Sequence, residues 1–279
     1  ATPSLVNRGD SLVLEGDAIP TNPRGTSTYY DCRDRVYVAG GAATVSRAAW
    51  TESAGVLLAV AWEVYPVRPQ LTTYILPFGE DLAASDPPDL QDFERVYALV
   101  QATGDGTVIH VDLDKDDIWD DLDWDRDGTT VSGDDSFTLN AGDVFLLDQA
   151  SINGAATGLN SGTKIQASDT IQVQYIIGDE GSGYEIRGLS AFPRGFWDDE
   201  YYAPVNSGAA SLNGNVDIYL YNPHDSILTI NYETASGNGT YTIDPKTTQS
   251  FYQATSSYVP LDSSVYLKGD DVFWGISTI

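Results

Sequence analysis

The sequence predicts an all-β protein made of antiparallel β-sandwich units of the jelly-roll or Ig-like kind, with the unit duplicated and an Asp-rich calcium-binding loop added. Three observations predict this class. Runs of alternating apolar and polar residues recur every ~8–12 residues, as in sandwiches and barrels. Helical periodicity is nearly absent. Asp outnumbers Glu by 32 to 9, and Asp favours turns and hard-cation sites whereas Glu favours helices.

Seven segments carry the pattern of strands or of the turns between them. The apolar segment 52–64 is short and bounded by Gly and Pro, so it is expected to form a buried strand. Alternation predicts four further strands, at 107–112, 170–177, 217–221 and 226–232. The last two flank a turn at 222–225, and Asn238-Gly239 predicts a type I′ turn immediately after them.

A weak internal repeat predicts the duplication. Residues 137–145 resemble 241–251, and residues 162–173 match 262–273. The segments at 95–98 and 216–220 each open one of these blocks. We expect two domains: residues 1–205, which carry an N-terminal arm and an Asp-rich loop at 112–135, and residues 206–279, a C-terminal sandwich unit.

Two motifs carry a family resemblance. The segment from Gly162 to Val173, and the later run from Pro193 to Val205, resemble the IgGFc-binding-protein N-terminal type of β domain found in secreted microbial surface proteins. The resemblance covers about residues 95–279 and rests mostly on the order of strands and turns. It implies an extracellular adhesive or structural role, and it transfers no catalytic residue.

The clearest chemical signal is a loop at 123–134. Acidic residues occupy loop positions 1, 3, 5 and 12, a glycine occupies position 6, and a carbonyl oxygen is available at position 7. Calcium binds six to eight hard oxygen ligands, so this spacing resembles the EF-hand-type loops of dockerins. The closing residue is Asp where the usual pattern has Glu. The predicted ligands are Asp123, Asp125, Asp127, Thr129 and Asp134.

A second acidic cluster precedes that loop. Eleven of the 24 residues from 112 to 135 are Asp, a density that repels itself strongly unless cations are bound. Asp112, Asp114 and Asp116 are therefore predicted to bind a second calcium ion, with Asp120 and Asp121 following them. The alternative is a solvated acidic loop without an ion.

Composition narrows the location and the partners. A net charge of −27 excludes nucleic acid, whose binding requires a basic surface. The opening residues Ala1-Thr2-Pro3 suggest a processed N-terminus, and no apolar run is long enough to span a membrane. The single cysteine, Cys32, permits no disulfide within the chain. These features predict an extracellular or cell-surface protein.

Catalytic signals are few. Asp198, Asp199 and Glu200 lie beside Trp197, Tyr201 and Tyr202, a combination that suits either a glycosidase, which needs two carboxylates, or a sugar-binding module. The alternative is that these aromatic residues pack on the sandwich. Two histidines and the absence of a Gly-x-Ser-x-Gly motif give no metal-hydrolase or triad signature.

The leading hypothesis is a non-enzymatic, calcium-stabilised structural surface protein. It would be a self-assembling subunit of a filament or layer, or an adhesin module. The apolar arm at residues 4–14 precedes a break rich in Pro and Gly, so it is free to add as a strand to a neighbouring subunit. The alternative for the arm is to fold back as the first strand of its own sandwich. The competing class is a carbohydrate-binding or glycoside-hydrolysing extracellular protein.

Overall fold

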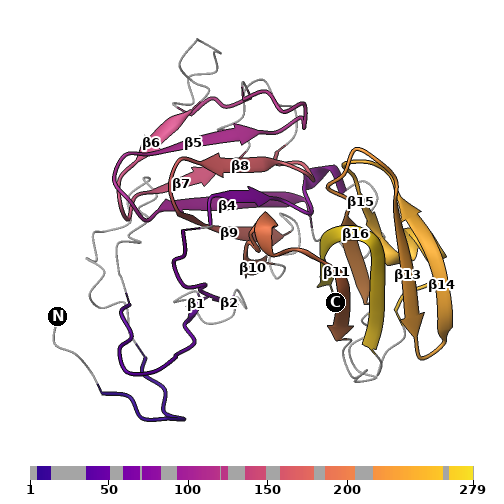
Figure 1. Cartoon of the computed structure of the whole chain (residues 1–279), viewed down its shortest axis with the longest axis horizontal. Coiled ribbons are helices and arrows are strands. Elements are labelled where there is room, and N and C mark those ends of the chain that lie inside the picture. Colours follow the sequence, from indigo (N-terminus) through magenta and orange to yellow (C-terminus); the bar gives the residue numbers. More distant parts are fainter. Residues whose placement is uncertain are drawn as a thin grey trace.

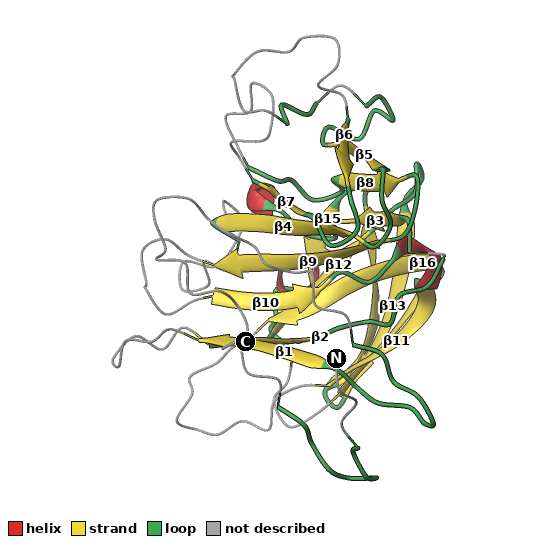
Figure 2. Cartoon of the chain, turned by 90° about the vertical axis from the view of Figure 1, so that its left-hand side faces the viewer, coloured by secondary structure: helices red, strands yellow, loops and turns green. Residues whose placement is uncertain are grey.

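The computed structural model confirms the all-β class. It describes residues 5–13, 36–50, 59–69, 71–82, 93–119, 121–124, 136–148, 158–178, 186–204, 216–259 and 264–278. Sixteen strands, two short 3₁₀ turns and one short α-helix make up the regular structure of this part of the chain. Strands therefore dominate (Figure 2), as the alternation and the Asp-over-Glu bias predict.

The strands form two lobes that lie side by side (Figure 1). The strands of the N-lobe are β3 (Thr73–Ile75), β4 (Arg95–Ala102), β5 (Thr107–Asp112), β6 (Phe137–Leu139), β7 (Val144–Leu147), β8 (Lys164–Ala167), β9 (Ile171–Gly178) and β10 (Ile186–Ser190). Those of the C-lobe are β11 (Asp198–Pro204), β12 (Asp217–Tyr221), β13 (Leu228–Thr234), β14 (Gly237–Ile243), β15 (Thr248–Ser250) and β16 (Ser264–Thr278). A hairpin of β1 (Ser46–Trp50) and β2 (Ala59–Glu63) precedes both lobes.

The N-lobe is a sandwich of two four-stranded antiparallel sheets, ordered β3-β8-β5-β6 and β10-β9-β4-β7. The chain crosses between the sheets at each step from β3 to β9 except from β5 to β6, which is jelly-roll connectivity. Alternate residues of each strand point inward, and β9 alternates buried and half-buried residues over most of its length. The two inner faces share one apolar core that includes Phe78, Ile109 and Val173.

The C-lobe is a smaller sandwich whose sheets share one long strand. The first half of β16 lies between β13 and β11, and its second half continues beside β12 and β15. Ile230, Val265 and Phe273 lie at the centre of its apolar core. A capped single-turn helix, α1 (Phe251–Thr255), connects β15 toward β16, and it buries Phe251 in that core.

The two lobes have the same strand order, which confirms the predicted duplication. Strands β12, β13, β14 and β15 occupy the positions of β4, β5, β6 and β7, and β11 occupies the position of β3. The pair β8 and β9 corresponds to the two halves of β16. The matched sequence blocks therefore fold into equivalent strands. The predicted boundary itself lies beside residues 205–215, outside the described part, and β11 pairs with β16 of the C-lobe.

Aromatic side chains fix the lobes to each other. Tyr219 of β12 is 1% exposed and belongs to the core of the N-lobe, with its ring edge-on to Phe93 at 4.8 Å. Trp274 of β16 stacks on Phe192 with centroids 4.6 Å apart, and Ile276 packs against the N-lobe core. One outer face of the C-lobe is thus buried by the N-lobe, so the two lobes pack against each other and are not independent units.

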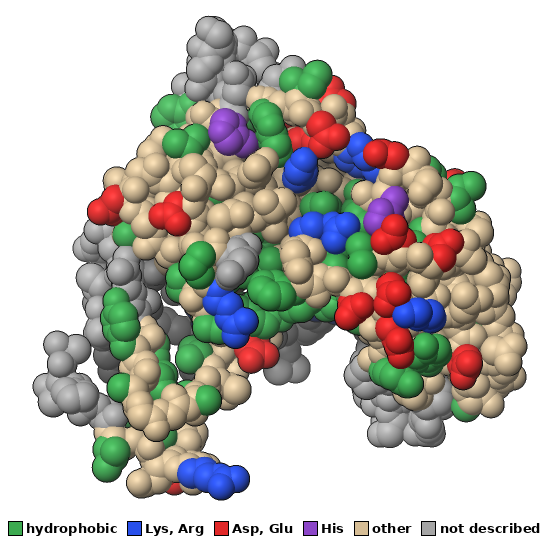
Figure 3. Space-filling view, viewed as in Figure 1, with side chains coloured by type: hydrophobic (Ala, Val, Ile, Leu, Met, Phe, Trp, Pro, Cys, Tyr) green, Lys and Arg blue, Asp and Glu red, His purple; other side chains and the backbone are tan. Residues whose placement is uncertain are grey.

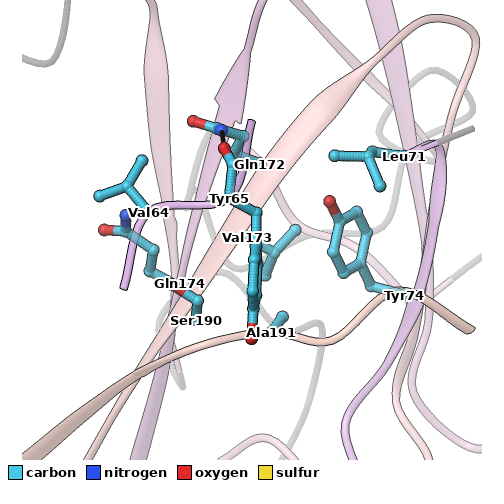
Figure 4. A pocket seen from close by; sticks show the side chains of 9 residues that line it. All are labelled: Val64, Tyr65, Leu71, Tyr74, Gln172, Val173, Gln174, Ser190 and Ala191. Atoms are coloured by element: carbon cyan, nitrogen blue, oxygen red, sulfur yellow. Dashed lines mark hydrogen bonds between the residues drawn. The ribbon is translucent and has the colours of Figure 1, made fainter. Parts of the chain in front are cut away.

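The β1–β2 hairpin is fastened beside the outer strand of the N-lobe. Gln172 donates from Nε2 to the carbonyl oxygen of Tyr65 (Figure 4). The Ser190 hydroxyl donates to the carbonyl oxygen of Glu63. The residues labelled in Figure 4 line a partly open cavity of about 10 Å³, which is room for no more than one water molecule. This cavity is too small to bind a substrate.

Among the helices that the structure describes, none is long and apolar enough to cross a membrane.

Two local predictions need correction. The hairpin turn between β13 and β14 lies at Ala235-Ser236, not at Asn238-Gly239, because the register pairs Leu228 with Ile243 and Ile230 with Tyr241 on the inner face. The strand predicted within 52–64 exists at β2. It is only half-buried, however, since Trp62 is buried while its neighbours Ala61 and Glu63 are exposed.

Candidate metal centre

The candidate metal centre lies at the end of β5, where the Asp-rich loop begins. Asp112 is the last residue of β5 and is 1% exposed. Its two carboxylate oxygens accept backbone N–H groups of Lys115 at 2.8 Å and Asp117 at 3.1 Å. These two residues have positive φ angles of 71° and 65°, which cost energy for residues other than glycine. The buried carboxylate therefore holds the loop in a strained, tightly curled path.

Three carboxylates converge inside this curl. One oxygen from each of Asp112, Asp114 and Asp121 lies within 4.8 Å of the others. Two oxygens bound to the same calcium ion at about 2.4 Å are separated by at most about 4.8 Å, so the cluster has the dimensions that an ion requires. Asp121 closes the cluster by accepting the N–H groups of Leu113 at 2.7 Å and Asp114 at 3.3 Å. The chemistry of the donors, three hard oxygens, suits a hard divalent cation.

The electrostatics of the loop favour bound positive charge. Burial raises the pKa of Asp112, and the nearby carboxylates of Asp117 and Asp121 raise it further, against the two backbone hydrogen bonds. A cation among these groups would offset both the burial and the mutual repulsion. Asp117 is the exception, because its hydrogen bond from Lys164 at 2.9 Å and the nearby Lys246 lower its pKa.

Three of the four lysines of the chain gather at this loop, where it touches the C-lobe. Lys115 donates from Nζ to the carbonyl of Lys246, and Lys246 donates from Nζ to the carbonyl of Lys115, each at 3.1 Å. Lys246 also lies 3.6 Å from Asp117 and 3.2 Å from Asp225. Figure 3 shows basic and acidic side chains side by side where the lobes meet. Hydrogen bonds and ion pairs of these lysines thus hold the Asp-rich loop against the turn before β15.

The predicted ligands fall into three groups. Asp112 and Asp114 are brought together as expected, whereas the carboxylate of Asp116 accepts the N–H of Ile118 at 2.7 Å and is not part of the three-residue cluster. Asp123 is buried, at 3% exposed. The remaining predicted ligands of the 123–134 loop lie outside the described residues: Asp125, Asp127, Thr129 and Asp134.

Sequence reasoning did not choose Asp121 as a ligand. It follows Asp112 by nine positions, with no repeat that links the two, and only the curl of the loop brings it back. The usable signal was the density of Asp in the segment, which identifies the region but not the individual ligands.

The acidic and aromatic run at 197–202 is arranged differently from a sugar cleft. Trp197 is buried and donates from Nε1 to the carbonyl of Phe192, and the Tyr201 hydroxyl donates to the carbonyl of Phe273. Two of the three aromatic side chains therefore pack on the sandwich. Tyr202 alone is well exposed, at 69%, and its ring lies 5.0 Å from that of Tyr266.

The carboxylates of this run are paired with a lysine. Asp199 and Glu200 approach Nζ of Lys268 at 2.7 and 3.5 Å, and the hydrogen bond from Lys268 lowers the pKa of Asp199. A general acid for glycoside hydrolysis needs a raised pKa, so Asp199 does not suit that role. The two histidines stay apart, His110 in β5 and His224 in the turn after β12.

Comparison with known proteins adds no relative. No family model matches the chain, and neither a curated protein nor a solved structure matches it. The resemblance to the IgGFc-binding-protein type of domain therefore stays a prediction, and function must be inferred from the molecule itself.

Proposed function

We propose that this chain is a secreted, calcium-stabilised structural surface protein that assembles into an extracellular filament or layer through its N-terminal arm. The observation that carries the proposal is the state of the arm. Residues 5–13 form no strand, and Figure 1 shows them (indigo) well apart from the sheets of both lobes. Their apolar side chains are exposed: Leu5 at 91%, Val6 at 46%, Leu12 at 52% and Val13 at 72%.

Such an arm gains stability by pairing with another subunit. Strand addition satisfies backbone N–H and C=O groups and covers apolar side chains in one step. The described arm contains one local turn, in which Asp10 donates its N–H to the Asn7 carbonyl at 3.0 Å, so it can be extended at little cost. An apolar arm left in water would be an aggregation hazard, which argues for a specific acceptor.

Calcium has two roles in the proposal. It would bind the cluster of Asp112, Asp114 and Asp121 and make the Asp-rich loop rigid beside the C-lobe. It would also lower the repulsion between subunits that each carry a net charge of −27. Assembly is therefore expected to require calcium or high salt.

The test replaces Leu5, Val6, Leu12 and Val13 by Ser, which keeps the length of the arm. We expect the wild-type protein to form filaments or layers in calcium, seen by electron microscopy, and the variant to stay monomeric by sedimentation. The matched control replaces Val36, Tyr37 and Val38 by Ser, since these side chains are also exposed and apolar and lie outside every described strand. Normal assembly of the arm variant, or a wild-type protein that is monomeric in concentrated calcium solution, would contradict the proposal.

A second candidate function is sugar binding by the exposed face of the C-lobe. The observation that favours it is the pair of Tyr202 and Tyr266 beside Glu200 and Lys268, an aromatic surface with polar neighbours. Binding to a glycan array that is lost in Tyr202→Ala and retained in Tyr252→Ala, another exposed tyrosine, would support it. Absence of binding in the wild-type protein would eliminate it.

A further inference from the structure

The duplicated lobes differ at one sheet edge, and the difference identifies a vacant strand position. Three edge strands of the C-lobe have counterparts that are also edges in the N-lobe: β11 matches β3, β14 matches β6, and β15 matches β7. The fourth comparison does not match. Strand β9 is an inner strand, between β4 and β10, whereas the second half of β16 pairs with β12 alone among the described strands.

The pairing registers give the length of the vacancy. In the N-lobe, β10 pairs antiparallel with residues 174–178 of β9. In the C-lobe, residues 274–278 of β16 pair with β12, and β11 pairs no further along β16 than Phe273. The five residues of β16 that no described strand covers on the side away from β12 thus correspond to the five residues of β9 that β10 covers in the N-lobe.

The donor in the N-lobe shows where a covering strand comes from. Strand β10 follows the whole N-lobe repeat in sequence and directly precedes β11, the first strand of the C-lobe. The sheet of one repeat is therefore completed by the strand that leads into the next repeat. The equivalent place in the C-lobe has no described strand, and the exposed apolar arm at residues 5–13, which lies in no described strand either, is a segment of this chain that can supply one to another copy.

We infer that residues 274–278 of β16 are the acceptor edge for the N-terminal arm of a second copy of this chain. This inference rests on the proposed function and specifies its interface. The arm offers nine described residues for a five-residue edge, with apolar side chains near both ends. Strand β10 fills the equivalent position with Leu189 packed against the N-lobe core, so an apolar side chain on the donor is what this position takes.

The edge is suited to docking because it is held rigidly. Ile276 packs against the N-lobe core and Trp274 stacks on Phe192, while Ser277 remains exposed. A rigid acceptor loses little conformational entropy when a strand adds to it. Copies joined in this way associate head to tail, an arrangement that grows into a filament when the rotation between successive copies does not close a ring.

The test is disulfide trapping between two single-cysteine proteins. In a Cys32→Ser background, one protein carries Val13→Cys on the arm and the other carries Ser277→Cys on the acceptor edge. The control acceptor is Asn238→Cys, which lies exposed on the open edge strand β14. Three further donor proteins, Leu5→Cys, Val6→Cys and Leu12→Cys, test the other registers in which the arm can pair with this edge. Each protein is first shown to assemble in calcium, and mixtures are then oxidised and analysed by mass spectrometry.

A docked arm holds its thiol near position 277 at high effective concentration, so we expect a heterodimer yield at least about tenfold above that of position 238. Equal yields at the two acceptors, or none at position 277 for any donor, would overturn the acceptor edge. If assembly is nevertheless lost when the arm is changed to serines, the proposed function survives and only this edge is wrong. If assembly does not need the arm, both are wrong.

Discussion

The two lobes have the same strand order but differ in the segment that connects one pair of hairpin strands. In the C-lobe, β13 and β14 are joined by the two residues Ala235 and Ser236. At the equivalent place in the N-lobe, β5 and β6 are separated by residues 113–136, which contain most of the Asp-rich segment. The acidic loop is therefore an insertion into one copy of a duplicated hairpin.

This difference shows how chemistry was added to a repeated fold. The sheets on both sides of the insertion keep their register, because inward-facing residues such as Ile109 and Ile230 still set it. The insertion carries the three clustered carboxylates and reaches the other lobe through Lys115 and Lys246. A loop can take on ligands and contacts while the core stays unchanged.

The largest expected effect breaks the junction between the lobes. Tyr219→Ala removes a ring that is fully buried against Phe93, so the free energy of unfolding should fall by about 3–5 kcal/mol. Urea denaturation followed by fluorescence and by circular dichroism measures the loss. The matched control, Tyr202→Ala, removes an exposed ring and should change stability by no more than about 0.5 kcal/mol. Equal effects of the two substitutions would mean that the lobes are not joined through Tyr219.

Calcium should stabilise the lobe that carries the insertion. An ion that binds only the folded protein adds about 2.7 kcal/mol at a hundredfold excess over its dissociation constant, and chelator should remove that gain. Asp114→Asn should weaken the response in a thermal melt, since it takes one charge from the cluster. Asp116→Asn is the control, because that carboxylate lies outside the cluster. A melting temperature that changes neither with calcium nor with chelator would refute the calcium site.

The second loop offers an independent calcium test. The spacing at 123–134 predicts that Asp125→Ala together with Asp127→Ala also reduces the calcium response. Isothermal titration of the two sets of variants separates the loops, since each set should remove its own binding event. A titration of the double variant that matches the wild-type protein would leave the cluster at Asp112 as the calcium site that the response reports.

The lysine contacts between the inserted loop and the C-lobe should contribute less to the free energy of unfolding. Lys246→Met keeps the aliphatic stem but removes the hydrogen bond to Lys115 and the ion pairs with Asp117 and Asp225, so it should cost about 1.5 kcal/mol. Lys268→Met serves as the control, since it breaks exposed ion pairs of one lobe only and should change stability less than Lys246→Met does. Chemical denaturation measures the stability of both variants. A larger loss in Lys268→Met than in Lys246→Met would mean that the lysine contacts do not couple the lobes.

The smallest effect concerns pH and the interior of the C-lobe. Burial raises the pKa of Asp217, so the folded protein binds this proton more tightly than the unfolded chain does. Stability contributed by the neutral acid is therefore lost as pH rises from the ordinary pKa of 3.8 through the folded value. Asp217→Asn can still accept from Ile218 and Tyr252, so it should flatten this slope and change stability near neutral pH by less than about 1 kcal/mol. An unchanged slope would contradict the role of Asp217.

Much of the fold was predictable because strand patterns are local. The predicted segments at 107–112, 170–177 and 217–221 all form strands with bounds within one residue of those expected. The Asn-Gly turn was not predicted correctly, since a turn is placed by the register of the strands beside it, and burial of Leu228 and Ile230 sets that register. The acid-rich region was predicted as a cation site, but the choice of Asp121 over Asp116 was not.

The sequence by itself determined the all-β class and the position of the acidic insertion, which follow from residue types at neighbouring positions, and the duplication, which follows from the similarity of two sequence blocks. The tertiary structure alone decided which carboxylates meet, how Lys115 and Lys246 bridge the lobes, and which sheet edge has no partner among the described strands. The carboxylates meet through the curl of one loop, whereas the lysine pair joins positions 131 residues apart. Contacts of that range depend on how sheets stack, and no local pattern of residues encodes them.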